Sequence, residues 1–228
     1  MPLLDEVRAI LLDIEGTTTP IAFVHDVLFS YAREHVREFL DSNAAADDIA
    51  LLREEHAIDV KEGRNPPPLI AEYVEWLIAL DRKSTGLKSL QGKIWRQGYE
   101  NGSLRSQVFP DVAPAFRRWS ERGLRISIFS SGSVLAQQLL FAHTEVGDLT
   151  RFITGYFDTR VGKKGDAESY RGIAEAMALE AHEILFISDV VAELEAANEA
   201  GMKTLMSIRP GNAPQPEYPS IRSFDEIR

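Results

Sequence analysis

The most constraining feature of the sequence is a set of short, nearly continuous apolar runs separated by segments with helical spacing. Such runs are typical of strands buried on both faces of a parallel sheet. The runs are Val7–Leu12, Leu124–Phe129, Ile184–Ile187 and Lys203–Ile208, with Phe152–Phe157 as a further candidate. The helical segments between them are Val112–Glu121, Val134–Phe141, Ala167–Ala178 and Glu193–Ala200. This alternation predicts an α/β fold with a doubly wound parallel sheet, which binds ligands outside the carboxyl ends of its strands.

Residues 20–105 have a different hydrophobic pattern, because they contain no strand-like apolar runs. One long amphipathic helix is predicted by the apolar stripe Val24, Val27, Leu28, Tyr31, His35, Phe39 and Leu40. Further helices are expected over Ile49–Ala57, Ile70–Leu80 and Leu87–Tyr99, with the prolines of Asn65–Pro68 separating two of them. We therefore expect a discontinuous core, residues 1–19 and 106–228, interrupted by an inserted all-helical cap domain at 20–105. The segment rich in proline and glycine from Pro210 onward predicts irregular surface structure.

Composition and charge exclude several classes of protein. The 228 residues carry 25 Lys and Arg against 35 Asp and Glu, and this formal charge of −10 disfavours nucleic-acid and acidic-membrane partners. Cysteine is absent, which excludes disulfides, thiolate nucleophiles and sulfur-ligated metals. The five histidines have no metal-ligand spacing, so oxygen-ligated cations such as Mg²⁺ are the expected metals. The N-terminal segment has no signal or membrane-spanning pattern, and we expect a cytoplasmic protein.

Four polar groups fall where predicted strands end, and parallel strands bring such ends to one edge of the sheet. The groups are Asp13 with Glu15, Ser130–Ser131–Gly132, Lys163–Lys164 and Asp189. The two aspartates suit a hard divalent cation. The Ser-Ser-Gly turn opens a helix and offers hydroxyl and N–H groups to a phosphoryl oxygen, and a lysine adds positive charge. In such a pocket Asp13 attacks phosphorus and Glu15 moves a proton to or from the leaving oxygen.

Each group also has a purely structural interpretation. An aspartate after a strand often caps a turn or a helix, a Ser-Ser-Gly turn often only begins a helix, and adjacent lysines are usually solvated. The order of the groups and their placement at strand ends favour one shared site over four separate structural roles.

The residues Asp13–Thr19 (DIEGTTT) resemble the first motif of the haloacid dehalogenase superfamily. In that motif an Asp attacks phosphorus, and the carboxylate two residues later acts as acid and base. The later motifs fall at Ser131, at Lys163 or Lys164, and at Ser188–Asp189 with Glu193. Glu15 stands where the superfamily usually has a second Asp, and Ser188 stands where it usually has Gly.

At these two positions, and over most of its length, the sequence resembles one family of the superfamily, the acireductone synthases. These are bifunctional enolase-phosphatases of methionine salvage. The resemblance is carried by DIEGTTTPIAFVHDVLF, FSSGSVLAQQLLF, YFDTRVGKKGDAESY, ISDVVAELEAANEAG and RPGNAP. It implies a haloacid dehalogenase-like core with a helical cap that recognises a methylthio tail. The implied reaction converts 2,3-diketo-5-methylthiopentyl-1-phosphate to the acireductone 1,2-dihydroxy-3-keto-5-methylthiopentene plus phosphate. Enolisation precedes dephosphorylation, which passes through an aspartyl-phosphate on Asp13.

The resemblance also implies a set of site residues. Asp13, Glu15 and Asp189 would hold one Mg²⁺ ion per chain, and Ser130, Ser131 and one lysine would contact the substrate. The distance in sequence to Glu168–Ser169–Tyr170 points to Lys164 rather than Lys163, although the chemistry of the two lysines does not separate them. Whether Glu15 binds metal through its side chain or its backbone carbonyl stays open. Glu193 is expected as a neighbour that supports the metal ligands, and Phe23 and His25 are expected to be structural rather than to line the boundary with the cap.

Several alternatives remain at this stage. A phosphatase of the same superfamily without enolisation differs by releasing no enediol, and a metal-free dehalogenase would be insensitive to a chelator. A receiver domain combines similar residues but lacks a large helical insert, and a nucleotide-binding protein would need glycine motifs that are absent. The group that transfers the proton in enolisation is unassigned, with Glu15 as a candidate. We expect a monomer.

Overall fold

The computed structural model describes every residue except 1–3, 5, 43–44, 81, 83, 213–217 and 228. The chain divides into two compact units. One, which we term the α/β unit, combines Met1–Phe23 with Arg105–Arg228, and the other, the helical unit, is Val24–Leu104. The assignment of residues 1–19 and 106–228 to a catalytic core and of 20–105 to a cap stays a prediction.

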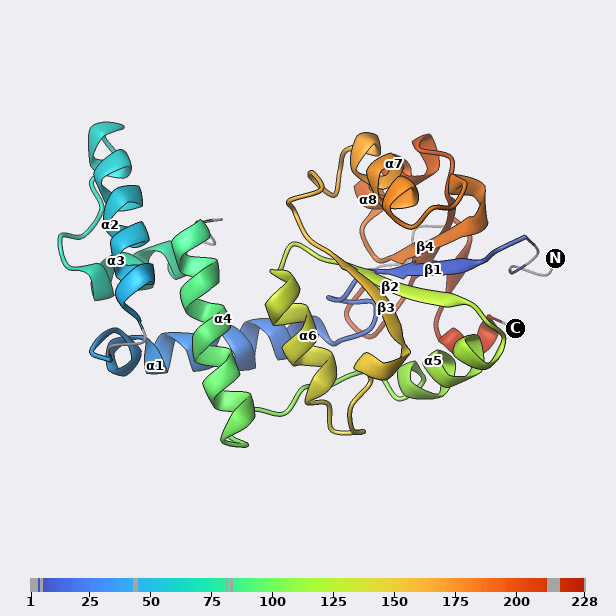
Figure 1. Ribbon diagram of the computed structural model, residues 1–228, viewed down its shortest axis with the longest axis horizontal. Helices are drawn as coiled ribbons and strands as arrows, with labels where there is room; N and C mark the ends of the chain where they lie inside the picture. Colours follow the sequence, from blue (N-terminus) through green and yellow to red (C-terminus); the bar gives the residue numbers. More distant parts are fainter. Residues whose placement is uncertain are drawn as a thin grey trace. The chain divides into compact units, whose positions relative to one another are not determined.

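Six parallel strands form one sheet in the α/β unit (Figure 1). They are β1 (Ala9–Leu12), β2 (Arg125–Phe129), β3 (Ile153–Phe157), β4 (Ile184–Ser188), β5 (Lys203–Ser207) and β6 (Ser220–Ile221), in the order β3-β2-β1-β4-β5-β6. In β1, Leu12 is level with Ile128 of β2 and with Ile187 of β4. The strand order reverses beside β1, and ligands of doubly wound sheets bind at such a switch point. The predicted doubly wound parallel sheet is confirmed.

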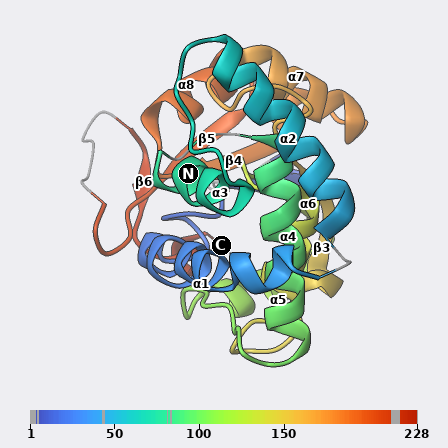
Figure 2. The same cartoon turned by 90° about the vertical axis from the view of Figure 1, so that its left-hand side faces the viewer.

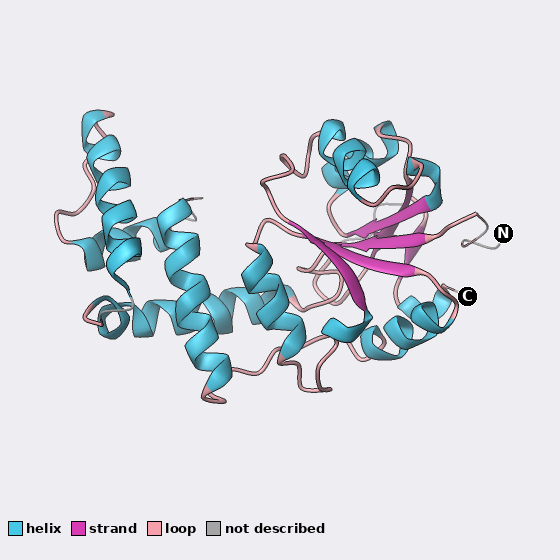
Figure 3. Ribbon diagram, in the orientation of Figure 1, coloured by secondary structure: helices cyan, strands magenta, loops and turns pink. Residues whose placement is uncertain are grey.

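Helices cover both faces of this sheet (Figure 3), which explains why the strand sequences are apolar without alternation. All four residues of β1 are fully buried. On one face, Leu11 belongs to a core cluster with residues of α7 (Ala167–Ala176) and α8 (Val191–Glu199). On the other face, α5 (Val112–Glu121) packs on β2, and α6 (Val134–Ala142) packs on β3.

The sequence pattern placed most of these elements to within two residues. The candidate strand at residues 152–157 is present as β3. Of the segment predicted to be irregular from Pro210 onward, residues 213–217 lie outside the described part of the chain. The prediction missed β6 and, near the C-terminus, the 3-10 turn η5 (Phe224–Glu226). A strand of two residues is too short to show periodicity, and its pairing with β5 comes from tertiary structure. Two further 3-10 turns are η3 (Thr150–Phe152) and η4 (Ala181–Glu183).

The helical unit contains α1 (Ser30–Leu40), α2 (Ala46–Lys61), α3 (Ile70–Ala79) and α4 (Thr85–Glu100). Helices α2 and α4 lie side by side (Figures 1 and 2). The first predicted helix begins as a π-helical turn, η1 (Phe23–Phe29), and this corrects one prediction. Val27 was placed on the apolar stripe but is 38% exposed, because the wider π-helical turn shifts the residues that face inward. Phe23 is buried, whereas His25 is exposed and packs edge-on against Phe29, and the structural role expected for both stays a prediction.

Two buried carboxylates join the helices of this unit. Asp59 of α2 is 2% exposed and accepts hydrogen bonds from Tyr73 Oη at 2.8 Å and from Arg82 Nη1 at 3.0 Å. Asp48, also in α2, accepts from Ser89 Oγ at 2.6 Å and Lys93 Nζ at 2.7 Å, both of α4. These hydrogen bonds and ion pairs hold α2 in a fixed register against α3 and α4. Among the described residues, no helix is long and apolar enough to cross a membrane.

Candidate functional site

Asp13 lies at the centre of the carboxyl edge of the sheet, directly after β1. It is 5% exposed, and its N–H donates to Ile187 O of β4 at 3.0 Å. The loop after it closes on itself, since the N–H groups of Thr17, Thr18 and Thr19 all donate to Ile14 O at 2.9–3.2 Å. This compact turn fixes the position of the Asp13 backbone.

The structure brings Lys164, rather than Lys163, to Asp13. Lys164 Nζ lies 2.5 Å from Asp13 Oδ1 and 2.6 Å from Glu193 Oε2, whereas Lys163 is exposed. Burial alone would lower the pKa of Lys164, but the carboxylates of Asp13 and Glu193 outweigh it and raise that pKa. The lysine therefore stays charged between two acids.

The first turn of α7 holds the loop that carries Lys164. Tyr170 Oη donates to Lys164 O at 2.7 Å, and Ser169 Oγ donates to Lys163 O at 2.7 Å. The Tyr170 ring is fully buried and packs against Phe129 of β2 and Phe186 of β4 with ring centroids 5.5 and 5.0 Å apart. Its hydroxyl therefore binds the lysine loop from a rigid position in the core.

Glu193 lies in the first turn of α8 and faces Lys164. Its Oε2 also accepts a hydrogen bond from Ser188 Oγ at 2.9 Å. Burial, followed by the charge of Asp13, raises the pKa of Glu193. The structure thus gives Glu193 a defined contact, which is the ammonium group of Lys164.

Asp189 follows β4 and adds a further carboxylate to the group formed by Asp13 and Glu193. Burial first, and then the charge of Asp13, raises the pKa of Asp189 to about 6. Gly16 has φ +70°, and a Cβ added there would lie 2.3 Å from Asp189 Oδ2, so glycine allows the β1 loop to approach this carboxylate. The ammonium group of Lys164 contacts Asp13 and Glu193, and its charge also acts on Asp189. A divalent cation would balance the negative charge that remains.

Two observations bear on whether Asp13, Glu15 and Asp189 form a metal site. Among the described residues, no group of three or more His, Cys, Asp and Glu side chains converges as a metal site. The charge of Glu15 reaches Asp189, where it raises the pKa, but Glu15 itself is half-buried and its backbone bridges to Thr19. The oxygen donors present nevertheless fit a hard cation that keeps several waters and is held by one or two carboxylates.

The Ser-Ser-Gly turn lies between β2 and α6. Ser130 is 5% exposed, and its Oγ accepts the Gly132 N–H at 3.1 Å, so this hydroxyl stabilises the turn itself. Ser131 is half-buried. The helix cap is Ser133, whose Oγ accepts from Ala136 N at 3.3 Å. Sequence reasoning missed this residue, although a serine just before an apolar helical segment is a cap signal.

Asp158 was also missed. It follows β3 at the same edge, is 7% exposed and accepts the Val134 N–H of α6 at 3.3 Å and Arg160 Nε at 3.0 Å. Its place directly after the candidate strand at 152–157 was the available signal. Asp158 therefore fixes the start of α6 beside the Ser-Ser-Gly turn.

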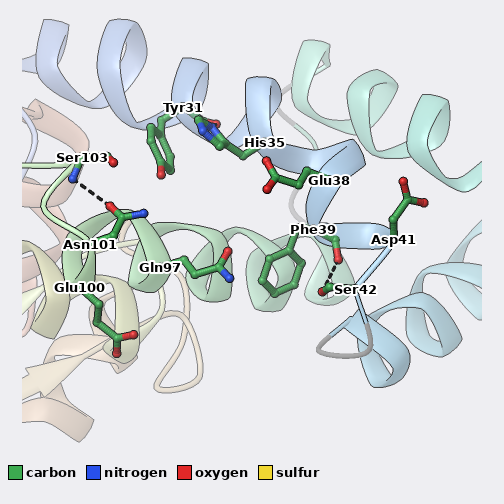
Figure 4. A pocket seen from close by; sticks show the side chains of 10 residues that line it. All are labelled: Tyr31, His35, Glu38, Phe39, Asp41, Ser42, Gln97, Glu100, Asn101 and Ser103. Carbon is green, nitrogen blue, oxygen red and sulfur yellow. Dashed lines mark hydrogen bonds between the residues drawn. The ribbon is translucent and has the colours of Figure 1, made fainter.

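A separate groove of about 750 Å³ lies in the helical unit between α1 and α4 (Figure 4). Tyr31 and His35 of α1 face Gln97 of α4 across it, and Glu38 and Glu100 contribute carboxylates. The described residues that line the groove include no lysine or arginine, and carboxylates alone repel a phosphate. Phosphate chemistry is therefore assigned to the strand-end cluster and not to this groove.

Comparisons with known proteins agree with this geometry. Residues 7–201 match the family of haloacid dehalogenase-like hydrolases. The "Enolase-phosphatase E1" of Synechococcus elongatus is 51% identical over 238 aligned positions, covering 100% of both chains. A "Probable bifunctional methylthioribulose-1-phosphate dehydratase/enolase-phosphatase E1" of Arabidopsis thaliana is 45% identical, covering 96% of this chain and 48% of that protein. The crystal structure of the UTR4 protein of Saccharomyces cerevisiae superposes with a TM-score of 0.80 at 36% identity, covering 96% of this chain and 99% of that one.

Proposed function

Since the chain belongs to the haloacid dehalogenase-like hydrolases and, within them, to the enolase-phosphatases, we propose that it is an acireductone synthase of methionine salvage. Its substrate is 2,3-diketo-5-methylthiopentyl-1-phosphate, and its products are 1,2-dihydroxy-3-keto-5-methylthiopentene and phosphate. The observation that carries this assignment is the contact of Asp13 with Lys164, beside Asp189 at the switch point of the sheet. In the Arabidopsis relative a methylthioribulose-1-phosphate dehydratase is named in the same chain, and loss of water from such a ketose phosphate yields a diketo phosphate.

The phosphatase half of the reaction starts from the Asp13 carboxylate. One Asp13 oxygen forms a bond to phosphorus as the ester P–O bond breaks, giving an aspartyl-phosphate that water then hydrolyses. Lys164 Nζ, 2.5 Å from Asp13 Oδ1, orients this carboxylate and offers positive charge to the phosphoryl oxygens. Ser131 and Ser130 contact further phosphoryl oxygens through their hydroxyl groups, and the Ser130 hydroxyl also holds the turn by accepting the Gly132 N–H. Glu15 gives a proton to the leaving oxygen.

Enolisation comes first and makes the leaving group better. A base removes a proton from C1, the electron pair of that C–H bond forms the C1–C2 double bond, and the C2 carbonyl oxygen takes a proton from water as its π bond to C2 breaks. The departing oxygen on C1 then belongs to an enol. Glu15 is a candidate for this base, because it is the carboxylate nearest in sequence to the nucleophile. Asp13, Asp189 and a Glu15 oxygen would hold one Mg²⁺ ion per chain, which would neutralise enolate and phosphate charge when bound.

The helical unit is the second part of the proposal. We assign residues 20–105 to a cap that excludes water during catalysis and recognises the methylthio tail, and residues 1–19 with 106–228 to the catalytic core. A cytoplasmic location and a monomeric state stay predictions from the sequence.

The test is to incubate the purified protein with the diketo phosphate and Mg²⁺ while phosphate and enediol absorbance are followed together. The two signals are expected to rise together, and an excess of chelator is expected to abolish both. Phosphate release without enediol would identify a plain phosphatase instead. Release that persists in chelator would contradict the metal assignment.

A further inference from the structure

The RPGNAP motif begins at Arg209, just after β5, and no step of the proposed reaction uses it. Arg209 is 6% exposed, and its guanidinium carbon lies 4.6 Å from the ring centroids of both Phe109 and Phe224. Its Nη1 lies 2.9 Å from Asp111 Oδ2 and donates to Arg222 O at 3.0 Å. A buried guanidinium fixed in this way is a rigid hydrogen-bond donor.

Three side chains of this segment donate to consecutive carbonyl groups in the loop after β1. Arg209 Nε donates to Thr17 O at 3.2 Å. Asn212 Nδ2 donates to Gly16 O at 3.1 Å, and Ser207 Oγ donates to the same oxygen at 3.3 Å. The segment from Ser207 to Asn212 therefore holds the backbone that directly follows Glu15.

The same short stretch of backbone lies against Asp189. A Cβ placed on Gly16 would be 2.3 Å from Asp189 Oδ2 and 3.2 Å from Asn212 Nδ2. Gly16 thus stands in close contact with Asn212 and with the carboxylate of Asp189. Any shift of the Gly16–Thr17 peptides changes the separation between this carboxylate and the residues on the β1 loop.

The N–H groups of the loop are satisfied within it, because Thr17, Thr18 and Thr19 donate to Ile14 O, and Gly16 donates to Thr19 O at 2.8 Å. These bonds close the turn but do not fix its orientation against β5. The donors of residues 207–212 supply that orientation.

We propose that Arg209 and Asn212 are positioning residues for the phosphatase centre. They contact neither substrate nor reacting atoms, and they hold the Gly16–Thr17 backbone so that Asp13 and Glu15 keep their places opposite Asp189. This inference rests on the proposed function. Arginine is required at 209 because one planar group must reach Thr17 O and Asp111 while it packs between two rings, which a lysine ammonium does not do.

The experiment compares Arg209→Lys and Asn212→Ala with the matched control Arg118→Lys. Arg118 Nη2 donates to Phe224 O at 2.8 Å, so the control disturbs the same C-terminal turn without touching the loop. For both test variants kcat is expected to fall about tenfold or more, with KM changing less than about threefold, because a misplacement of about 1 Å at a catalytic group costs up to about 10²-fold. Hydrogen exchange of the Gly16–Thr19 amides is expected to accelerate about tenfold. In Arg118→Lys both quantities stay within about twofold of the wild type.

A rescue experiment separates positioning from general loss of structure. Arg209→Ala leaves a space between Phe109 and Phe224 that fits a guanidinium ion, and millimolar guanidinium is expected to restore a measurable part of kcat. Methylammonium at the same concentration is expected to restore none.

Three outcomes would overturn the inference. The first is that Arg209→Lys and Asn212→Ala fold and keep the wild-type kcat. The second is that hydrogen exchange of the residue 16–19 amides is unchanged in these variants. The third is that guanidinium and methylammonium restore the kcat of Arg209→Ala equally. If Arg209→Lys does not fold, Asn212→Ala decides alone, since Ser207 still binds Gly16 O. If the wild type releases no phosphate, the proposed function fails, and the exchange measurement still decides whether this segment orders the loop.

Discussion

Replacing Gly16 with alanine is the sharpest test of the geometry at the switch point. The new Cβ would lie 2.3 Å from Asp189 Oδ2 and 2.7 Å from its Cγ, whereas ordinary contacts begin near 3.4 Å. The carboxylate, or the loop that carries Gly16, must therefore move by about 1.1 Å, which is the difference between 3.4 and 2.3 Å. Either movement changes the position of Asp189 relative to the β1 loop.

The expected magnitudes follow from this displacement. A shift of about 1 Å at a catalytic group costs about 10²-fold in rate. The left-handed backbone at φ +70° costs an alanine roughly 1–2 kcal/mol of stability in addition. Gly16→Ala should therefore remain folded at 25 °C and lose about two orders of magnitude in kcat.

The matched control is Gly123→Ala. Gly123 has φ +77°, and a Cβ added there would have no atom within 4 Å, so this variant carries the backbone strain without the displacement. Gly123 lies between α5 and the amino end of β2, whereas the site lies at the carboxyl end of the strands. Both variants are compared by thermal unfolding and by steady-state phosphate release. If kcat of Gly16→Ala stays within about threefold of Gly123→Ala, the contact with Asp189 does not matter for catalysis and the reasoning is refuted.

Three further predictions test other parts of the chain. Asp13→Asn should abolish phosphate release with circular dichroism unchanged; phosphatase activity at the wild-type level would remove Asp13 as the nucleophile. Tyr170→Phe leaves the part-buried Lys164 carbonyl without this donor, so calorimetry should show a loss of about 1 kcal/mol of stability, together with a higher KM. Burial raises the pKa of Asp59, but hydrogen bonds from Tyr73, Arg64 and Arg82 outweigh it and hold that pKa below its ordinary 3.8. Both arginine partners are partly exposed, so Asp59→Asn should cost about 1–3 kcal/mol at pH 7 in urea unfolding. Because the native pKa is the lower one, this difference should shrink as the pH falls below 3.8, and a difference independent of pH would contradict the ion pair.

The arrangement of strands could be predicted because burial on both faces leaves a direct mark on the sequence. The apolar run that includes Ala9–Leu12 has no polar residue within the strand, and in the structure each of its four strand residues is fully buried. Exceptions occur where the pattern is short or the helix is irregular. β6 has two residues, and the π-helical turn at Phe23–Phe29 exposes Val27 although its spacing fits an α-helical stripe.

The polar groups of the site could be predicted as a set, because each follows a strand end. Their contacts could not, since they depend on how separate loops meet. Lys163 and Lys164 are chemically alike, and the choice between them is made by Tyr170 and Ser169, which hold the loop so that only Lys164 reaches Asp13. Ser130 as a substrate contact stays a prediction, and only the structure shows that its hydroxyl also accepts the Gly132 N–H.

The sequence by itself determined the parallel sheet, the helical insertion and the chemistry available at the strand ends, because hydrophobic periodicity and residue type are local properties. Only the tertiary structure decided that Glu193 pairs with Lys164, that Gly16 lies against Asp189, and that Arg209 and Asn212 hold the Gly16–Thr17 carbonyls. These contacts join residues up to 196 positions apart. Hydrogen bonds and charge interactions act over a few ångströms in space, and no pattern along the chain records which distant groups the fold will bring to that distance.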